Sequence, residues 1–473
     1  MKKFKRIAAL ALALVMLVTA LAGCGAKGKE ELKGVTEDTI LVGNTAGTTG
    51  ALATIGGPFN IGIEAAFAAY NAAGGFNGKS VKLQHYDDGG VAANSVTLTE
   101  QLIHEDEVFA IVGNFASNCV AANLPVIKEA NVPMVYAAAG NDELLNEKAE
   151  GAERGIFPVQ PLNFTEGRMM ILRAFAPADN GGLAGTKVGV LSNTVEASQT
   201  MLKGIQAEAA ELGSKKDSIV YQNVTSSDYS AAVSALKNAG CNVVVVTVIG
   251  ADFTSALTAM ANANYYVPVL TSYNNANAGV LNDPATTLLA SQYTDVIANI
   301  PIFAQAWLDI TSTEYYYNKA DSALLKNYET LGLAQAGVGM PGFKEEYWAV
   351  AENIYNYCVG QGMANAFAMS YDSYALAGYI AGDLFCQGLK ELQAKGKDLT
   401  RANYVDIMES KEFQVAMADK ISFANGMRSG VQSFALTMFY DAFTVNNGAY
   451  HSAASVTVHG LTSIEEYRTL VKG

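Results

Sequence analysis

The sequence predicts an α/β protein with two similar lobes, each built around a parallel sheet that helices cover on both faces. Apolar strand segments alternate with amphipathic helices, and this alternation occurs twice, before and after a proline-containing segment at 156–163. The segments VPMVYA (132–137) and YVPVLTS (266–272) occupy equivalent places in the two halves. With 473 residues, of which 50% are hydrophobic and 16% charged, the chain is long enough for roughly two to four domains.

In the first half, the apolar segment 40–44 predicts a strand, and a Gly/Thr loop follows it. Pro58 is expected to open a helix, because proline is favoured in a first turn, where its missing N–H costs nothing. Phe59 and Ile63 lie on one face of this helix, and Gly74-Gly75 ends it. The other elements predicted for this half are strands at 81–86, 108–113 and 132–137 and helices at about 91–105 and 118–130.

The second half repeats the pattern after a crossover at 156–163. Its predicted strands are 187–192, 217–222, 242–248 and 266–272, with helices between them, one capped by Asp228 and one at about 252–264. Further along, we expect a strand crossing back at 296–301, an insertion at about 283–345, a helical region at about 344–415 and a hairpin or short meander at 421–450.

Such crossings make both lobes discontinuous in sequence, with several strands acting as a hinge. The expected ranges are 35–157 plus about 298–425 for the first lobe, 158–297 plus about 426–450 for the second, and 451–473 for a C-terminal segment.

The N-terminus has the features of a secretory signal. Basic residues at 2–6 precede an apolar run at 7–20 that is short for a membrane span, and the run ends in LAGC at 21–24. LAGC resembles the lipobox of bacterial lipoproteins, which implies removal of 1–23 and diacylation of Cys24. An ordinary signal peptide or an uncleaved anchor are the alternatives. Residues 24–34 are expected to form a flexible tether, which places the rest of the chain outside the cytoplasmic membrane.

The composition excludes several classes of function. A formal net charge of −14 argues against nucleic acid as a partner and against adhesion to anionic lipid through basic patches. Four histidines and five scattered cysteines leave little material for a metal enzyme or a disulfide scaffold. We therefore expect neither a metal nor a cofactor.

Motifs that suggest chemistry have simpler explanations. GVGMPG (337–342) matches the dinucleotide fingerprint but follows no strand, and His104-Glu105 lacks the second histidine of a zinc motif. Asp87-Asp88 suit a loop or cap better than a metal site. Cys119 lies at a predicted helix start, where a thiol can be activated, but a packing role is favoured. The chain has no nucleophile elbow, so binding is a better interpretation than catalysis.

Polar residues and glycines follow the predicted strands, at the edge where parallel sheets bind ligands. Ser117 or Asn118 is expected to cap the following helix, and the free N–H groups at that helix start suit a carboxylate. The alternative is that Ser117 is only a cap. The candidate ligand-binding residues are Ser117, Asn118, Ala138, Gly140, Glu196, Gly250, Tyr273 and Asn274.

At this point a family resemblance is visible. The stretch from ILVGNTAGTTG to YDDGG (40–90) resembles the opening of substrate-binding proteins of branched-chain amino-acid ABC transporters, and so do AIVGNFASN, VPMVYAAAGNDEL, SYDSYALA and ISFANGMRSG. The resemblance covers about 35–300 and 365–450. It implies the type I periplasmic-binding-protein fold, in which two lobes close on a small solute and deliver it to a permease with its ATPase.

Residue by residue, the resemblance places the family's carboxylate-binding serine on Ser117 and its backbone-contributing alanine on Ala138. The family's ammonium-binding threonine falls on Gly140, its first-loop aromatic on Ile55, and its second-lobe acid near Tyr273, and all three are departures. Its second-lobe tyrosine falls near Gly250. The acid is therefore missing from its usual place. Either Glu196 or Asp252 supplies the charge, or the solute lacks an α-ammonium and meets Tyr273; we favour the second, because Gly140 would leave room for a bulkier ligand.

Three functions are compatible with this sequence to different degrees. The first is a lipid-anchored, non-enzymatic solute-binding component of an ABC importer, on the periplasmic side if an outer membrane is present. The second is a ligand-sensing subunit of the same fold that acts on a receptor or signalling partner. The third, a secreted hydrolase, is disfavoured because the chain has no nucleophile–base motif.

Overall fold

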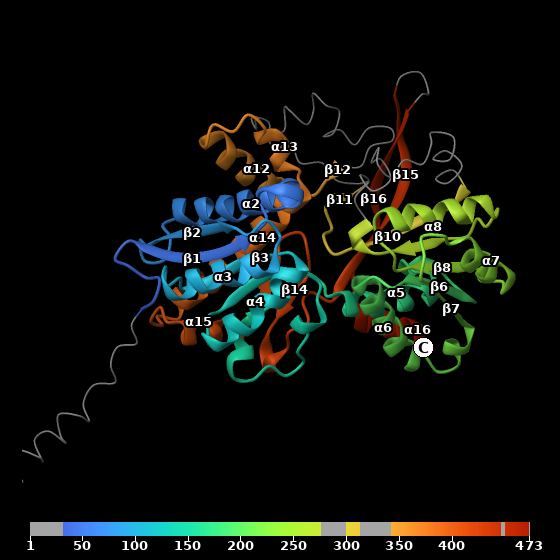
Figure 1. Ribbon diagram of the computed structural model, residues 1–473, viewed down its shortest axis with the longest axis horizontal. Helices are drawn as coiled ribbons and strands as arrows, with labels where there is room; N and C mark the ends of the chain where they lie inside the picture. The colour runs from blue at the N-terminus through green and yellow to red at the C-terminus, as the bar shows by residue number, and fades with distance from the viewer. Residues whose placement is uncertain (1–31, 276–298, 313–341, 446–449, 473) are drawn as a thin grey trace, which may run out of the picture.

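The computed structural model describes residues 32–275, 299–312, 342–445 and 450–472, which fold into two α/β lobes lying side by side (Figure 1). The first lobe combines the N-terminal segments with the helices of residues 345–408, and the second combines the middle of the chain with the C-terminal hairpin. Each lobe is therefore assembled from segments far apart in the sequence.

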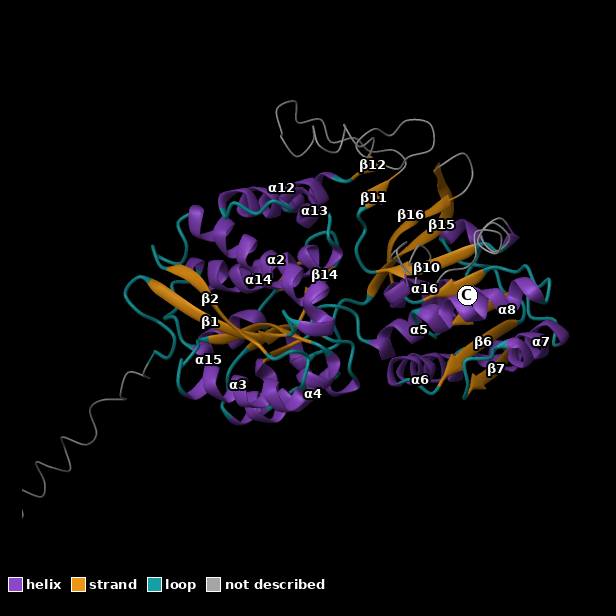
Figure 2. Ribbon diagram, turned by 45° about the horizontal axis from the view of Figure 1, so that its top comes forward, coloured by secondary structure: helices purple, strands orange, loops and turns teal. Residues whose placement is uncertain are grey.

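The sheet of the first lobe is parallel throughout, in the order β2-β1-β3-β4-β5. Every residue of β3 is buried, as a central strand of a two-sided sheet requires. Helices α2 and α14 lie over one face together with α12, and α3 and α4 lie on the other (Figure 2). The bounds are β1 Thr39–Ala46, β2 Ser80–Asp87, β3 Ala110–Phe115, β4 Met134–Ala138, β5 Ile156–Phe157, α2 Ala53–Ala72, α3 Ala92–His104, α4 Ser117–Glu129, α12 Glu345–Gly360, α13 Ala366–Ser370, α14 Ser373–Ala394 and α15 Arg401–Met408.

One helix start differs from its expected place. Helix α2 begins at Ala53, directly after a 3-10 turn at Gly50–Leu52, so the expectation that Pro58 opens it is wrong. Residues 53–57 include no proline and continue the turn into the helix. Pro58 then lies in the second turn, where its ring removes the one hydrogen bond that would reach Thr54.

The second sheet has the order β16-β15-β10-β9-β8-β6-β7. Strands β15 and β16 are antiparallel additions to a parallel sheet. Helices α5, α6 and α16 cover one face, and α7 and α8 cover the other (Figure 1). The bounds are β6 Val188–Asn193, β7 Ile219–Val224, β8 Val243–Val246, β9 Val269–Thr271, β10 Ile302–Ala306, β15 Ser433–Val445, β16 Tyr450–Ser463, α5 Asn163–Phe175, α6 Glu196–Ala210, α7 Ser230–Asn238, α8 Ala251–Asn262 and α16 Ile464–Lys472.

Two expected boundaries differ from what the strand pairing shows. Strand β10 pairs with β9 and β15, so the chain leaves the second sheet after residue 306 and not at about 298. Residues 450–472 are not a separate segment, because β16 pairs with β15 and α16 packs on α5. Of the expected insertion at 283–345, residues 283–298 and 313–341 lie outside the described residues, and its described part includes β11 (Thr311–Ser312) paired with β12 (Gly342–Phe343).

Among the described residues, no helix is both long and apolar enough to cross a membrane. The apolar run at 7–20 lies outside them.

The connections between the lobes are held together by backbone hydrogen bonds. The chain crosses between the lobes first in the segment that contains Val159, then in the one that contains Asp309, and last in the one that contains Val431. Val431 N donates to Val159 O at 2.9 Å, so the first and last crossings run beside each other. Asp309 N donates to Met417 O at 2.7 Å, which ties the middle crossing to the small hairpin of β13 (Glu412–Gln414) and β14 (Lys420–Ser422). The lobes are thus joined by paired chains rather than by one free linker.

A fully buried carboxyl group lies beside this hinge. Glu166, in the first turn of α5, accepts hydrogen bonds from Ser272 Oγ at 2.9 Å and from Tyr273 N at 2.7 Å. Burial raises the pKa of Glu166 to about 8, and the two hydrogen bonds oppose the rise without cancelling it. Tyr273 in turn donates its hydroxyl proton to Pro161 O at 3.1 Å. The end of β9 is therefore fastened both to α5 and to the first crossing.

Helices α2 and α14 approach closely because glycines face each other's backbone. A Cβ atom at Gly62 would lie 2.0 Å from Ala375 O, and one at Gly378 would lie 1.8 Å from Phe59 O. Such distances leave no room for any side chain, so this crossing requires both glycines.

We predict that Gly62→Ala destabilises the protein by about 1–3 kcal/mol, the usual cost of overpacking a core. Gly57→Ala is the matched control in the same helix. No atom lies within 4 Å of its added methyl group, so it should be neutral or stabilising by up to about 1 kcal/mol. Urea unfolding checks both variants, and equal midpoints would contradict the close crossing.

We also predict that stability falls as the pH rises from about 4.5 to 8. In this range the folded protein retains the Glu166 proton, whereas the unfolded chain, with its ordinary carboxyl pKa of 4.5, has lost it. The stabilisation is thus complete below pH 4.5 and is lost as the pH rises through 8. Glu166→Gln should flatten this dependence in urea unfolding, and the exposed Glu196→Gln should retain the wild-type slope. A Glu166→Gln slope equal to that of wild type would refute this prediction.

Candidate functional site

Ser117 and Asn118 form the first turn of α4, directly after β3. The N-cap is Ala116, with φ +73°, so the expectation that Ser117 or Asn118 caps this helix is wrong. The chain reverses at Ala116 in a conformation that costs a non-glycine residue energy, and Ser117 is already helical. Ser117 is exposed, and its hydroxyl has no hydrogen-bond partner among the described residues. The start of α4 therefore offers a hydroxyl and the helix's first N–H groups to a ligand.

Ala138 and Gly140 lie beside this helix start. Phe115 pairs with Ala138 across β3 and β4, and Asn141 Nδ2 donates to Ser117 O at 3.2 Å. Gly140 leaves no free space, however, because a Cβ atom there would lie 2.7 Å from Asn163 Oδ1. The expectation that Gly140 makes room for a bulkier ligand is therefore wrong, since Asn163 of the other lobe fills that room.

Gly250 occupies the equivalent turn in the second lobe. It is the N-cap of α8 with φ +62°, a conformation that glycine adopts without strain. Its N–H donates to Asn275 Oδ1 at 3.0 Å, and Asn275 Nδ2 donates to Val248 O at 2.9 Å and Thr271 Oγ1 at 2.8 Å. This buried amide joins the ends of β8 and β9 and orients the start of α8.

The two second-lobe acids differ in availability. Asp252 accepts a hydrogen bond from Asn193 Nδ2 at 2.9 Å and is partly buried, so one of its oxygens is engaged within the lobe. Glu196 is the first residue of α6, is exposed, and has no ion-pair or hydrogen-bond partner among the described residues. Of the two, Glu196 is the acid that remains free to meet a positive group.

Tyr273 and Asn274 are largely occupied by the protein itself. The Tyr273 hydroxyl is committed as a donor to Pro161 O. Asn274 folds back, with its N and Nδ2 atoms donating to Ser272 Oγ at 3.1 and 3.0 Å. Asn274 is nevertheless exposed, and Tyr273 is only partly buried.

The two lobes contact each other next to these residues. Asp142, which follows Asn141, accepts from Lys203 Nζ at 3.2 Å and from Thr200 Oγ1 at 3.4 Å, both on α6. Asn163 N also donates to Gly140 O at 3.1 Å. The segment after β4, the first residue of α5 and the first half of α6 therefore form one junction between the lobes.

The other candidates have structural roles. Asp87 accepts hydrogen bonds from the loop after β1, and Asp88 Oδ1 accepts from Gly90 N at 2.8 Å. Cys119 is buried, and burial raises the pKa of its thiol to about 11, so it is not an activated nucleophile. Within the described residues, no cluster of three or more metal-ligating side chains occurs, and Cys119, Cys241, Cys358 and Cys386 are free thiols.

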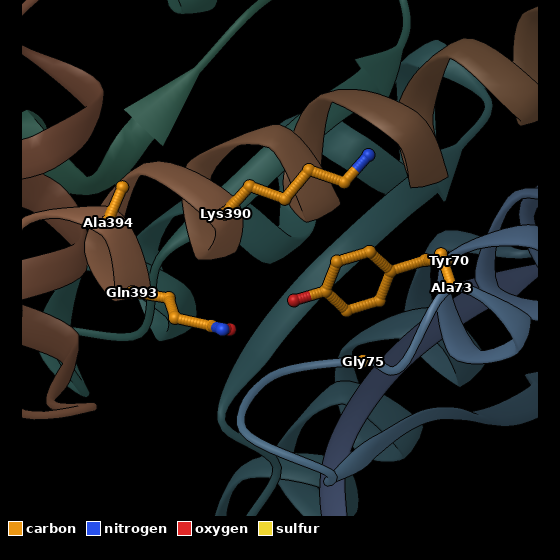
Figure 3. A pocket seen from close by; sticks show the side chains of 6 residues that line it. All are labelled: Tyr70, Ala73, Gly75, Lys390, Gln393 and Ala394. Carbon is orange, nitrogen blue, oxygen red and sulfur yellow. The ribbon is translucent and has the colours of Figure 1, made fainter.

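A hollow of about 370 Å³ lies elsewhere, between the C-terminal ends of α2 and α14 (Figure 3). Lys390 Nζ lies 5.5 Å from the centre of the Tyr70 ring, at helix ends that favour a cation. The buried Tyr70 hydroxyl has no hydrogen-bond partner in the described part of the chain, which costs stability but does not identify a ligand. We do not include this hollow in the site.

Sequence reasoning did not single out Asn163 and Glu166, which shape the junction, or His85, which contacts the loop after β1. Asn163 is the last residue of the predicted crossover, so its position was a usable signal. Nothing in the local sequence indicates that Glu166 is buried, because it lies in the polar first turn of an amphipathic helix.

Solved structures with this fold are similar over nearly the whole chain. A fatty acid ABC transporter substrate-binding protein from Thermomonospora curvata matches with a TM-score of 0.61 at 16% identity, over 94% of this chain and 98% of that chain. The branched-chain amino acid transporter substrate binding protein LivJ from Streptococcus pneumoniae, in complex with isoleucine, matches with a TM-score of 0.52 at 16% identity, over 89% of this chain and 100% of that chain. At such identities the likeness shows the fold alone.

Curated relatives match a shorter region. A Leu/Ile/Val-binding protein homolog 2 from Brucella abortus is 27% identical over 205 residues, which is 43% of this chain and 53% of the relative. An amino acid binding protein from Pseudomonas aeruginosa is 25% identical over 207 residues, 43% of this chain and 52% of the relative. The chain thus spans about half the length of the curated relatives it matches.

The family model for periplasmic binding proteins matches residues 39–440, which include both sheets and the junction between them. This is a family of extracytoplasmic solute-binding proteins, not of enzymes. The two-lobe parallel fold, the crossings and the match over most of the chain agree, and the chain belongs to the periplasmic binding protein family.

Proposed function

We propose that this protein is the extracytoplasmic, lipid-anchored solute-binding component of an ABC importer, which captures an amino acid or a related carboxylate or amide between its lobes. The observation that carries the proposal is the open start of α4, where the exposed Ser117 hydroxyl and the first helical N–H groups lie beside Ala138 and opposite the second lobe. A helix N-terminus with free N–H groups suits a carboxylate.

The free acid of the second lobe, Glu196, is the candidate partner for an ammonium group of the solute. A closed site removes water from its ligand, so an enclosed ammonium needs a counter-charge. Glu196 is exposed and unpaired among the described residues, whereas Asp252 is held by Asn193. With Gly140 closed off by Asn163, the reason to favour a bulky solute without an ammonium is removed. We therefore assign the ammonium-facing role to Glu196.

Membrane attachment and delivery complete the proposal. The basic residues, apolar run and LAGC sequence at 2–24 support a diacylated Cys24, because two acyl chains are needed for stable anchoring. The paired crossings support opening and closing of the lobes, which would let a permease distinguish loaded from empty protein.

We expect calorimetry to show binding of at least one of leucine, phenylalanine and their deaminated acids, and scattering to show a smaller radius of gyration with that solute bound.

Ser117→Ala should weaken binding roughly tenfold or more, since a hydrogen bond to a charged group contributes about 1.5–3 kcal/mol and tenfold is about 1.4 kcal/mol.

Ser230→Ala is the matched control, because Ser230 is likewise the first residue of a helix, α7, on the second lobe. It should leave the affinity unchanged. Binding without compaction would contradict closure. Equal affinities of wild type and Ser117→Ala, with equal melting temperatures, would remove Ser117 from the site.

We expect Cys24→Ser to release the protein from membranes or to leave it unprocessed, because the serine hydroxyl cannot be acylated in place of the thiol. Cell fractionation and the mass of the mature N-terminus check this. Cys119→Ser, at a buried free thiol, is the control for loss of a cysteine. Identical processing and membrane partition of wild type and Cys24→Ser would disprove the anchor.

A further inference from the structure

The loop after β1 is linked to the start of α4 through Gly90, which follows β2. A Cβ atom at Gly47 would lie 2.9 Å from Gly90 N, and Gly90 O accepts a hydrogen bond from Asn118 Nδ2 at 3.0 Å. Thr48 and Thr49, which follow Gly47, are partly and fully exposed. These two hydroxyl groups therefore lie on the same edge of the first sheet as the start of α4.

His85 determines which way the Thr48 hydroxyl proton points. Asn44 Nδ2 donates to Asn60 Oδ1 at 2.8 Å and to Gly113 O at 3.2 Å, which orients the amide and leaves Asn44 Oδ1 facing His85 Nδ1 at 3.0 Å. An acceptor at that position requires the proton to be on Nδ1. In the neutral ring Nε2 is then a bare acceptor, 3.1 Å from Thr48 Oγ1, and it takes the threonine proton.

The charge state of His85 follows from its surroundings. Burial lowers the pKa of His85 below its ordinary value of 6.5, although the carboxylates of Asp87 and Asp88 act in the opposite direction. Asn44, Asn60 and Thr48, the other groups around the ring, are uncharged. The imidazole is therefore neutral at pH 7.5, as the proton placement above requires.

Asp87 fixes the second hydroxyl in the same way. Its carboxylate accepts from Thr49 Oγ1 at 2.5 Å and from the N–H groups of Thr48 and Gly89 at 2.9 and 3.0 Å. Burial acts to raise the pKa of Asp87, but these hydrogen bonds outweigh it and lower the pKa to about 2. Asp87 is thus always an acceptor, and the Thr49 proton is always directed toward it.

We propose that His85 and Asp87 make the Thr48 and Thr49 hydroxyls a wall that only accepts hydrogen bonds, so that the site selects solutes carrying an N–H or O–H donor beside their carboxylate. Both threonine oxygens present only lone pairs, which a donor satisfies and a second acceptor repels. This inference rests on the proposed solute-binding function and makes His85 a positioning residue for specificity.

The first test compares leucine with 4-methylpentanoate, and phenylalanine with 3-phenylpropanoate, by calorimetry at pH 7.5. Each pair differs in one ammonium group. Wild type should prefer the amino acid, and Thr48→Val, which keeps the shape but removes the oxygen, should reduce this preference about tenfold. Thr97→Val is the control, because its hydroxyl donates to Ala93 O within α3 at 3.2 Å, and it should not alter the preference.

The second test uses pH. Below the pKa of His85, Nε2–H donates to Thr48 and frees the threonine proton to face the solute, so the preference should weaken as the pH falls through the pKa of His85, which lies below 6.5. Thr48→Val should remove this dependence. Nitrogen NMR of the imidazole in the free protein should show a protonated Nδ1 and a bare Nε2 at pH 7.5.

The outcomes separate the two proposals. If none of the four solutes binds, the proposed function and this inference both fail. If solutes bind but the preference is the same in wild type and Thr48→Val, only the acceptor wall is refuted. A protonated Nε2 at pH 7.5 also refutes it, whether or not solutes bind.

Discussion

The parallel direction of the strands in both lobes is the constraint on which the rest of the molecule depends. A parallel strand delivers its carboxyl end, and the helix after it delivers its N-terminus, to one edge of the sheet. In this chain that edge carries Ser117 in one lobe and Glu196 in the other, and the ion pair of Asp142 with Lys203 of α6 joins the two lobes. The polar groups and helix dipoles of the two halves are thereby directed at one junction.

The turns at this junction depart from ordinary backbone geometry in both lobes. Ala116 and Gly250 each have a positive φ at the N-cap of a helix that follows a central strand. Glycine adopts such a conformation freely, whereas alanine does so at a cost that its surroundings must offset. At Ala116 the buried strand β3 before it and the hydrogen bond from Val120 N to Ala116 O at 2.8 Å hold the turn in place. The turn keeps the first N–H groups of α4 directed outward and without a side-chain partner. A serine side chain at a relaxed N-cap would have accepted a hydrogen bond from one of these N–H groups.

The sequence was sufficient to predict the strands and helices of the two halves, because buried parallel strands are continuous apolar runs and the helices between them are amphipathic. It was less informative where contacts between distant segments decide. The start of α2 depends on a 3-10 turn rather than on Pro58, and β10 belongs to the second sheet because β15 returns to pair with it. The edges that bear Ser117, Ala138 and Glu196 were predictable from strand order. The burial of Glu166 and the direction of Tyr273 were not, because both result from packing across the hinge.

The contact between Gly140 and Asn163 illustrates why the residue type at a single position is a poor guide to ligand size. Read along the chain, a glycine where the resemblance places a threonine suggests an enlarged site. In three dimensions the vacated volume is occupied by an amide from the first residue of α5, which also bonds through its backbone N–H to Gly140 O. Where the resemblance places a threonine in one lobe, the volume is thus filled by a side chain from the other lobe, across the hinge. The same atoms then contribute both to the surroundings of Gly140 and to the contact between the lobes, so a substitution at either position also alters that contact.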